Sequence, residues 1–180
     1  MKNKLVLILM IFAPFFLMAQ SDDQINMPEI PLDESGMIKY VEVVKEDANK
    51  EELFKRCVRW VNSEYKNPNS VINTRDMVNG KIELHHQFRV YNTLESGTKA
   101  NAGTVMYTMI IRFKDGRYRV QMNDFLIKRT IRTNAEIWLD ETHADYSPSY
   151  ASQLNDYALE KLASLKKKMM PEKVIVEEEW

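Results

Sequence analysis

The acidic and histidine side chains near residue 140 form the group most able to hold a metal ion. Asp140, Glu141, His143 and Asp145 offer oxygen and nitrogen ligands at close spacing, and such ligands suit a divalent cation. Their spacing matches neither the helical zinc-protease pattern nor the calcium-loop pattern. The spacing therefore favours a solvated acidic loop and predicts no metal site and no cofactor. A metal-dependent hydrolase that uses loop 140–145 remains an alternative.

The other two histidines are adjacent, and the chain has one cysteine. On a strand, His85 and His86 point to opposite faces and cannot bind the same ion. His86 shares its face with apolar residues, which predicts a neutral core histidine that is hydrogen-bonded to one partner. The lone Cys57 excludes a disulfide framework, and we expect it to be buried on a helix. No catalytic residue is predicted.

Basic side chains recur at alternate positions of the clearest strand patterns. Residues on the polar face of these strands include six lysines and arginines and one glutamate. Such a face could bind a carboxylate, a phosphate, an acidic glycan or an acidic protein segment. Alternatively, it is an ordinary solvent-exposed face of a sheet, on which threonine and arginine ladders favour strand pairing. The candidate ligand-binding residues are Lys81, His85, Arg89, Arg112, Arg117 and Arg119.

The elements that must position these residues can be read from the periodicity of apolar side chains. Asn49 and Glu52 have the spacing of a capping box and begin a helix that Asn67-Pro68 ends; a second helix begins at Ser147-Pro148 and ends before Pro171. Asn79-Gly80 predicts a two-residue hairpin turn. Near Asn123-Asp124 the alternation slips by one residue, which indicates a β-bulge. The expected strands span 37–44, 71–78, 81–91, 104–114 and 118–127, with a loop over 93–103 and a short strand at 136–139 in the irregular segment 130–146.

These elements predict an α+β fold in the order β-α-β-β-β-β-α. Each clear strand has one apolar and one polar face, so the sheet is antiparallel and covered on one face only. We expect a curved sheet that grips both helices on its apolar face. Four methionines fall on the strands and could line an apolar pocket between sheet and helices, although a packed core is favoured. They are Met37, Met77, Met106 and Met109.

The ends of the chain differ in composition from the middle. Lys2 and Lys4 precede an apolar run to Met18, which predicts a signal peptide over 1–19 and an exported protein, either periplasmic or at the cell surface or secreted. Removing it leaves no spanning segment and takes the net charge from −1 to −3, since two lysines are lost. A linker over 20–36 and the domain over 37–170 follow. The acidic tail 171–180 contains Val174-Ile175-Val176, which could add to a sheet edge of this or another chain.

Several short motifs occur in an order that resembles a known family. The chain is similar to secreted bacterial domains of unknown function with a TATA-box-binding-protein-like fold, over residues 30–168. The resemblance implies the fold and no activity, and the DNA binding of the fold's namesake does not follow from it. The motifs are Met18-Ala19-Gln20, Tyr40-Val41-Glu42-Val43-Val44, Glu52-Leu53 with Trp60, Asn79-Gly80 and Lys114-Asp115-Gly116-Arg117-Tyr118.

The sequence thus predicts a non-catalytic binding module that uses the open basic face of its sheet. The partner would be an acidic protein, a glycan or a small molecule. Nucleic acid is not expected, because the aromatic residues fall on the inward face, and the near balance of 25 basic and 26 acidic residues gives no overall attraction to it. The first alternative is a carrier of an apolar small molecule between sheet and helices, and the second is the hydrolase described above.

Overall fold

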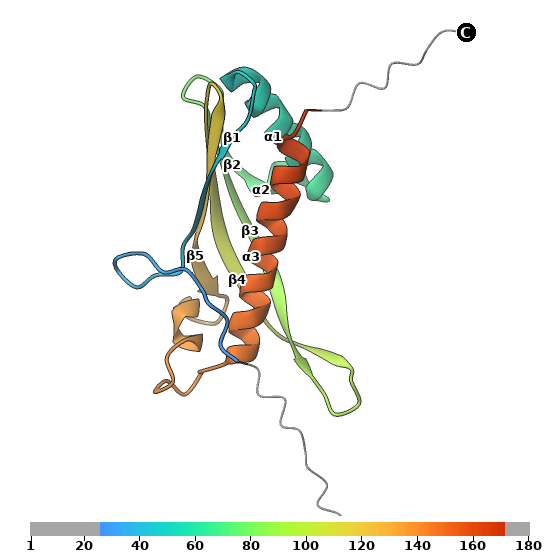
Figure 1. Cartoon of the computed structure of the whole chain (residues 1–180). Helices are drawn as coiled ribbons and strands as arrows, with labels where there is room; N and C mark the ends of the chain where they lie inside the picture. Colours follow the sequence, from blue (N-terminus) through green and yellow to red (C-terminus); the bar gives the residue numbers. More distant parts are fainter. Residues whose placement is uncertain (1–25, 172–180) are drawn as a thin grey trace, which may run out of the picture.

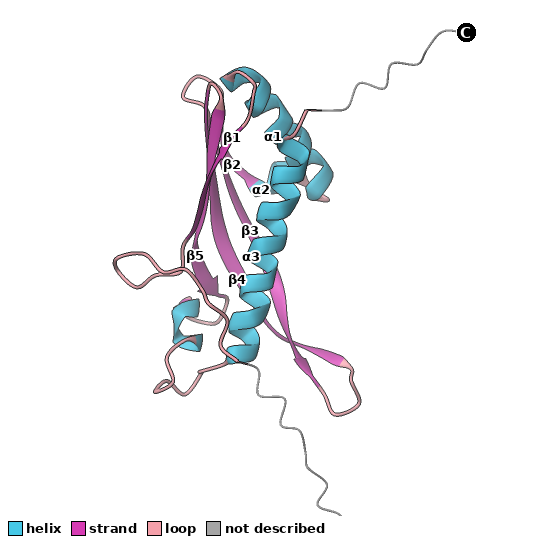
Figure 2. Cartoon of the chain, viewed as in Figure 1, coloured by secondary structure: helices cyan, strands magenta, loops and turns pink. Residues whose placement is uncertain are grey.

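A computed structural model describes residues 26–171 and shows an open antiparallel sheet with two long helices on one face (Figures 1 and 2). The strand order is β1-β5-β4-β3-β2, and β6 pairs with β5. The predicted order of elements and the one-sided cover are confirmed. The predicted signal peptide and residues 172–180 of the tail lie outside the described residues. The elements are β1 Tyr40–Lys45, α1 Lys50–Glu64, α2 Pro68–Val71, β2 Ile72–Asp76, β3 Lys81–Thr93, β4 Lys99–Lys114, β5 Arg117–Ile127, β6 Thr133–Asn134, the 3₁₀ helix η1 Ala135–Trp138 and α3 Pro148–Met169.

The apolar side chains of the central strands fill the space beneath α1 and α3. Leu84, Met109 and Ile111 are completely buried, and each occupies a position predicted to point inward. The helices contribute Trp60 and Leu154, which are also completely buried. Burial of this kind stabilises a domain by roughly 25 cal/mol for each Å² of apolar surface removed from water. We call this face of the sheet the helix side and the other the open face.

Both long helices begin as the sequence predicts. The Asn49 side chain accepts a hydrogen bond of 2.9 Å from the backbone N–H of Glu52, and the Ser147 hydroxyl accepts one of 3.3 Å from the N–H of Tyr150. Each cap satisfies a backbone donor that the first helical turn leaves unpaired. Cys57 is buried on α1 as expected, and burial raises the pKa of its thiol.

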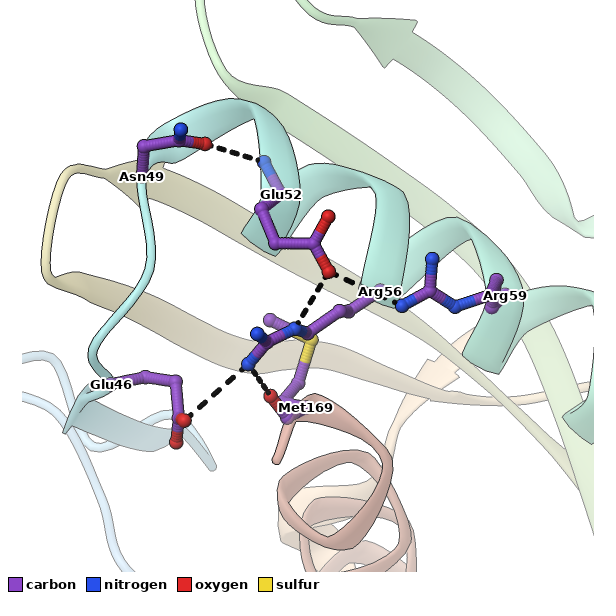
Figure 3. A network of polar contacts seen from close by, with 6 residues as sticks. All are labelled: Glu46, Asn49, Glu52, Arg56, Arg59 and Met169. Atoms are coloured by element: carbon purple, nitrogen blue, oxygen red, sulfur yellow. Dashed lines mark hydrogen bonds and ion pairs between the residues drawn. The ribbon is translucent and has the colours of Figure 1, made fainter. Parts of the chain in front are cut away.

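A buried arginine joins α1 to β1 and α3 (Figure 3). Arg56 is 8% exposed. Its Nη1 donates to the Met169 carbonyl at 2.9 Å and to Glu46 at 3.4 Å, and its Nε donates to Glu52 at 3.0 Å. One guanidinium therefore satisfies the end of α3, the residue after β1 and the first turns of α1. We call these contacts the Arg56 network.

Several predicted boundaries are wrong. The expected loop over 93–103 is mostly strand, because β3 and β4 continue as a two-stranded ribbon that turns at 94–98. The ribbon projects beyond the helices in Figure 2, so its pairing needs no apolar face. The expected strand at 136–139 is instead the 3₁₀ helix η1, whose Ala135 and Trp138 are buried. The expected strand over 71–78 is shorter at both ends, since α2 includes Val71 and the hairpin turn before β3 spans the four residues 77–80 instead of the predicted two.

The predicted β-bulge is confirmed, and the segment before β1 packs on the domain. The register of β4 and β5 shifts between Met106 and Thr108, and the opposite strand carries Asp124 at a positive φ of 55°. Met27 and Ile30, from the predicted linker, pack against the core. Strand β1 itself begins at Tyr40 rather than at residue 37.

Within residues 26–171, no helix has both the length and the apolar character needed to cross a membrane.

Candidate functional site

The predicted basic residues lie on the open face, and the register brings some of them together. Lys81 lies opposite Arg112, and Arg112 lies opposite Arg119 on the next strand. The adjacent pair Lys114 and Arg117 closes the β4–β5 hairpin beside them. Because paired residues on neighbouring strands point to the same face, these side chains project together.

Strand β1 extends this group with a residue that the sequence analysis missed. Lys45 lies opposite Arg117, and Val43 lies opposite Arg119. Strands β1 and β5 are far apart in the sequence, so strand alternation gives no sign of this pairing. We call the resulting group the basic cluster; its members are Lys45, Lys81, Arg112, Lys114, Arg117 and Arg119.

Two of the predicted site residues lie away from the basic cluster. His85 and Arg89 are on the open face opposite Thr108 and Thr104. Arg89 follows Lys81 by eight residues, which is about 26 Å along a strand. The prediction that all six residues share a face agrees with the register, but the structure gathers only Lys81, Arg112, Arg117 and Arg119 of them.

Four members of the basic cluster line a hollow of about 330 Å³. Arg112, Lys114 and Arg117 are exposed there, and Arg119 is half-buried. Among residues 26–171, none of these four has a carboxylate within ion-pair distance. Val43 adds an apolar side chain to the same hollow. Closely spaced cations without counter-charges raise the local positive potential and favour an anionic partner.

Lys81 is the member of the basic cluster whose charge is balanced. Its Nζ lies 2.5 Å from Glu83, which also accepts from the Asn73 amide at 2.8 Å and contacts His85 at 3.1 Å. The hydrogen bond from Lys81 is the main reason that the pKa of Glu83 is lowered. The carboxylate stays ionised and neutralises this side of the face, so the charge left unbalanced among the described residues lies on β1, β4 and β5.

A second hollow, of about 540 Å³, lies where the bulge interrupts the open face. Half-buried Met106 and Leu126 give it apolar walls, and His85, Asp124 and Arg132 add polar ones. The prediction that Met106 belongs between sheet and helices is wrong, because it lies opposite Gln87 on the open face. Met109 is buried on the helix side, and Met37 and Met77 are half-buried.

The helix side carries a polar group inside the core. The Tyr107 hydroxyl lies 3.3 Å from that of Tyr65 and 3.1 Å from that of Tyr157. The ring of His86 packs against Tyr65 and Tyr107 with centroid distances of 4.8 and 6.1 Å. Its Nδ1 is buried and makes no hydrogen bond with any described residue, so the expected hydrogen-bonded partner is not found there.

Charge and burial set the protonation of this polar group. Burial, and then the nearby Lys161 ammonium, lowers the pKa of His86. Burial raises the pKa of Tyr157 to about 12. The Lys161 ammonium lies 5.2 Å from the centre of the Tyr157 ring and pairs with Glu64. The tyrosines and His86 therefore stay neutral near pH 7, and they pack as part of the core.

The acidic residues of the loop near residue 140 bond to neighbouring side chains and backbone groups. Asp145 forms a bidentate ion pair with Arg129, with hydrogen bonds of 2.9 and 3.0 Å. Asp140 accepts hydrogen bonds from the backbone N–H and the hydroxyl of Thr142. The His143 ring accepts a 3.0 Å hydrogen bond from the Asp145 N–H. In the part of the chain from 26 to 171, no three histidine, cysteine or acidic side chains gather as a metal site would require.

Comparison with known families and structures agrees with this architecture. Residues 40–128 match the family model described as a domain of unknown function, DUF4468, with a TBP-like fold. The crystal structure of a DUF4468 family protein from Bacteroides ovatus is 14% identical with a TM-score of 0.65, over 80% of this chain and 92% of that one.

A second solved structure gives the same result. A TBP-like protein from Parabacteroides distasonis is 15% identical with a TM-score of 0.63, over 78% of this chain and 96% of that one. Identities this low establish the fold alone. The search of curated proteins found no match. The sequence-based resemblance to a TBP-like domain family is confirmed, and the activity must be argued from the site.

Proposed function

Because residues 40–128 form a DUF4468 domain with a TBP-like fold, we propose that the protein is a binding module that captures an anionic partner on the open face of its sheet. The observation that carries this proposal is the basic cluster. Four of its cations, Arg112, Lys114, Arg117 and Arg119, line one hollow and have no carboxylate partner among residues 26–171. Uncompensated charge of this kind disfavours the free state slightly and is relieved when an anion binds.

The geometry suits a carboxylate-rich ligand. An arginine presents several N–H donors in one plane and can bind a carboxylate through two parallel hydrogen bonds. Arg112 and Arg119 are direct neighbours across β4 and β5, so they could hold successive acidic groups. Val43 offers an apolar contact beside them. An acidic protein segment combines both features, and we propose it as the partner class.

The proposed location is outside the cytoplasm, in the periplasm or at the cell surface. It is supported by the lysine-flanked apolar run of residues 1–19, which is typical of a signal peptide. These residues lie outside the described part of the chain. Expression of the full chain in a bacterial host and mass measurement of the exported form would test the predicted cleavage after Ala19.

Charge reversal tests the binding proposal. The double variant Arg112→Glu and Arg119→Glu removes two attractions and introduces two repulsions. At about 0.5 kcal/mol for each exposed charge contact, the affinity for poly-glutamate should fall about thirtyfold. Binding can be followed by fluorescence anisotropy of labelled poly-glutamate across a salt titration. The wild-type affinity should itself fall as salt rises.

A matched control changes the same charge elsewhere. Lys55 and Lys66 are exposed, one on α1 and one just after it, on the helix side. The double variant Lys55→Glu and Lys66→Glu has the same net charge as the test variant and should retain binding. If both variants lose affinity equally, the effect is one of overall charge, and the basic cluster is not the site.

A further inference from the structure

Strand β1 forms one edge of the sheet, and along part of this edge the outward backbone groups have no partner among residues 26–171. The Lys39 N–H donates outward to the Pro31 carbonyl at 2.9 Å, whereas the Glu46 N–H donates inward to Gly116 at 3.0 Å. Successive residues of an antiparallel strand alternate between these two directions. Val41, Val43 and Lys45 therefore present their backbone N–H and C=O groups outward. Among the described residues, β1 pairs only with β5.

Apolar side chains flank this edge on both faces of the sheet. On the open face, Val41 and Val43 are 43% and 59% exposed. On the helix side, Leu159 of α3 is 49% exposed. Exposed apolar side chains that gather beside unpaired backbone groups are typical of a surface that another chain covers.

Two contacts show that Leu159 faces the β1 edge. Asn155 accepts a 2.9 Å hydrogen bond from the Tyr40 hydroxyl, and Lys166 lies 2.9 Å from Glu42. With 3.6 residues per turn, positions 155, 159 and 166 fall on one side of a helix. Leu159 thus lies between two residues of α3 that contact β1.

The charge beside the edge selects the kind of strand that fits. A strand added to β1 would lie two strand spacings, about 10 Å, from β5. Arg117 and Arg119 point from β5 to the open face, and Lys45 lies on β1 itself. Acidic side chains on the added strand would meet these cations. A second copy of this chain would instead bring another row of cations against them, which charge repulsion disfavours.

We propose that the β1 edge binds an extended partner segment in which acidic residues alternate with apolar ones. The segment would pair with the outward backbone groups of Val41, Val43 and Lys45. Its acidic side chains would face the basic cluster, and its apolar side chains would face Leu159. This inference rests on the proposed function and specifies the binding mode as strand addition, in which backbone hydrogen bonds supply affinity and alternate side chains supply selectivity.

Amide hydrogen exchange on the full-length protein tests the mode directly. The probe is a short, end-blocked peptide that alternates valine with glutamate. Its binding should slow exchange at the amides of Val41, Val43 and Lys45 about tenfold or more. The amides of Glu42 and Val44, which already face β5, should change little. Slow exchange at the three outward amides in the free protein would show that the edge is already covered and would overturn the proposal.

A backbone-methylated peptide separates strand addition from charge attraction. The same sequence with N-methyl groups on alternate residues keeps every charge and loses the donors that face β1. It should bind at least about tenfold more weakly, since each lost hydrogen bond weakens binding by up to about that factor. Equal binding of the two peptides would overturn strand addition and leave the proposed function intact. Binding of poly-glutamate but of neither peptide would also overturn it.

A pair of variants at one position provides a second measurement. Val43→Pro removes an outward N–H while leaving the bonds to β5, because proline is tolerated where its missing N–H faces away from the sheet. It should weaken binding of the unmodified peptide about tenfold. Val43→Thr keeps the N–H and the β-branched shape and should bind the peptide about tenfold more tightly than Val43→Pro. Equal affinities of two folded variants would contradict the proposal.

Discussion

Replacement of Arg56 should reveal how strongly one buried side chain ties the helices to the sheet. In Arg56→Met, the new side chain keeps most of the apolar stem and loses every hydrogen bond of the Arg56 network. The Met169 carbonyl at the end of α3 and the Glu46 carboxylate then lose their donor. The variant should fold but unfold at a lower denaturant concentration.

The contacts of Arg56 set the size of the effect. A hydrogen bond between a charged donor and a buried carbonyl contributes about 1.5–3 kcal/mol. The side chains of Glu46 and Glu52 are 17% and 40% exposed, so water weakens both ion pairs, and together they contribute about 1 kcal/mol. We therefore expect the free energy of unfolding to fall by about 3 kcal/mol, or the melting temperature by about 9 °C for a domain of this size.

Urea unfolding followed by tryptophan fluorescence measures this loss, because Trp60 is completely buried on the same helix. Lys55→Met is the matched control: it makes the same chemical change at an exposed position of α1 and should alter stability by less than about 0.5 kcal/mol. A loss below about 1 kcal/mol in Arg56→Met, or equal losses in both variants, would refute the assignment of a structural role to the Arg56 network.

Two further predictions concern the core and a turn. The pKa of His86 is lowered in the folded protein, so the unfolded chain binds a proton at this residue more readily, and the free energy of unfolding should fall as pH drops below about 6.5. In His86→Phe this fall should be smaller, as measured by urea unfolding at neutral and mildly acidic pH. An unchanged pH dependence would contradict the prediction. Gly80 has a φ of +59°, and an added Cβ would lie 2.8 Å from the Phe113 carbonyl oxygen. Gly80→Ala should therefore lower the free energy of unfolding by about 2 kcal/mol. Gly97→Ala, where φ is +77° and no atom lies near the added Cβ, should lower it by about 1 kcal/mol. Equal losses of stability in thermal unfolding would count against the close contact at Gly80.

Strand alternation predicted the faces of the sheet correctly because burial on one side enforces it. A shift of one residue would move Ile82 and Leu84 into water, so their register is strongly constrained. The same reasoning placed Arg112 and Arg119 on the open face. Alternation does not reveal which strands are neighbours, and for that reason Lys45 was missed. Its pairing with Arg117 depends on β1 returning to the edge of the sheet beside β5.

The errors arose where structure depends on contacts rather than on periodicity. The small residues of 93–103 suggested a loop, yet the hairpin ribbon forms and is held to α3 by Gln153, whose side chain bonds both the N–H and the carbonyl of Tyr91. Residues 136–139 suggested a strand, yet the Glu136 carboxylate accepts the Ile38 N–H at 2.7 Å within a 3₁₀ turn. Neither long-range contact has a signature in the local sequence.

The two faces of the sheet divide stability from recognition. The Arg56 network and the buried tyrosines lie on the helix side. The basic cluster lies on the open face, where Arg112 and Arg119 form no ion pair with a carboxylate among the described residues. Repulsion between these two arginines opposes folding slightly, so replacing one of them with glutamate creates a cross-strand attraction. Such a variant should be at least as stable as the wild type. A loss of binding in it would then reflect the surface rather than the fold, which makes the open face a site where recognition can be measured separately from stability.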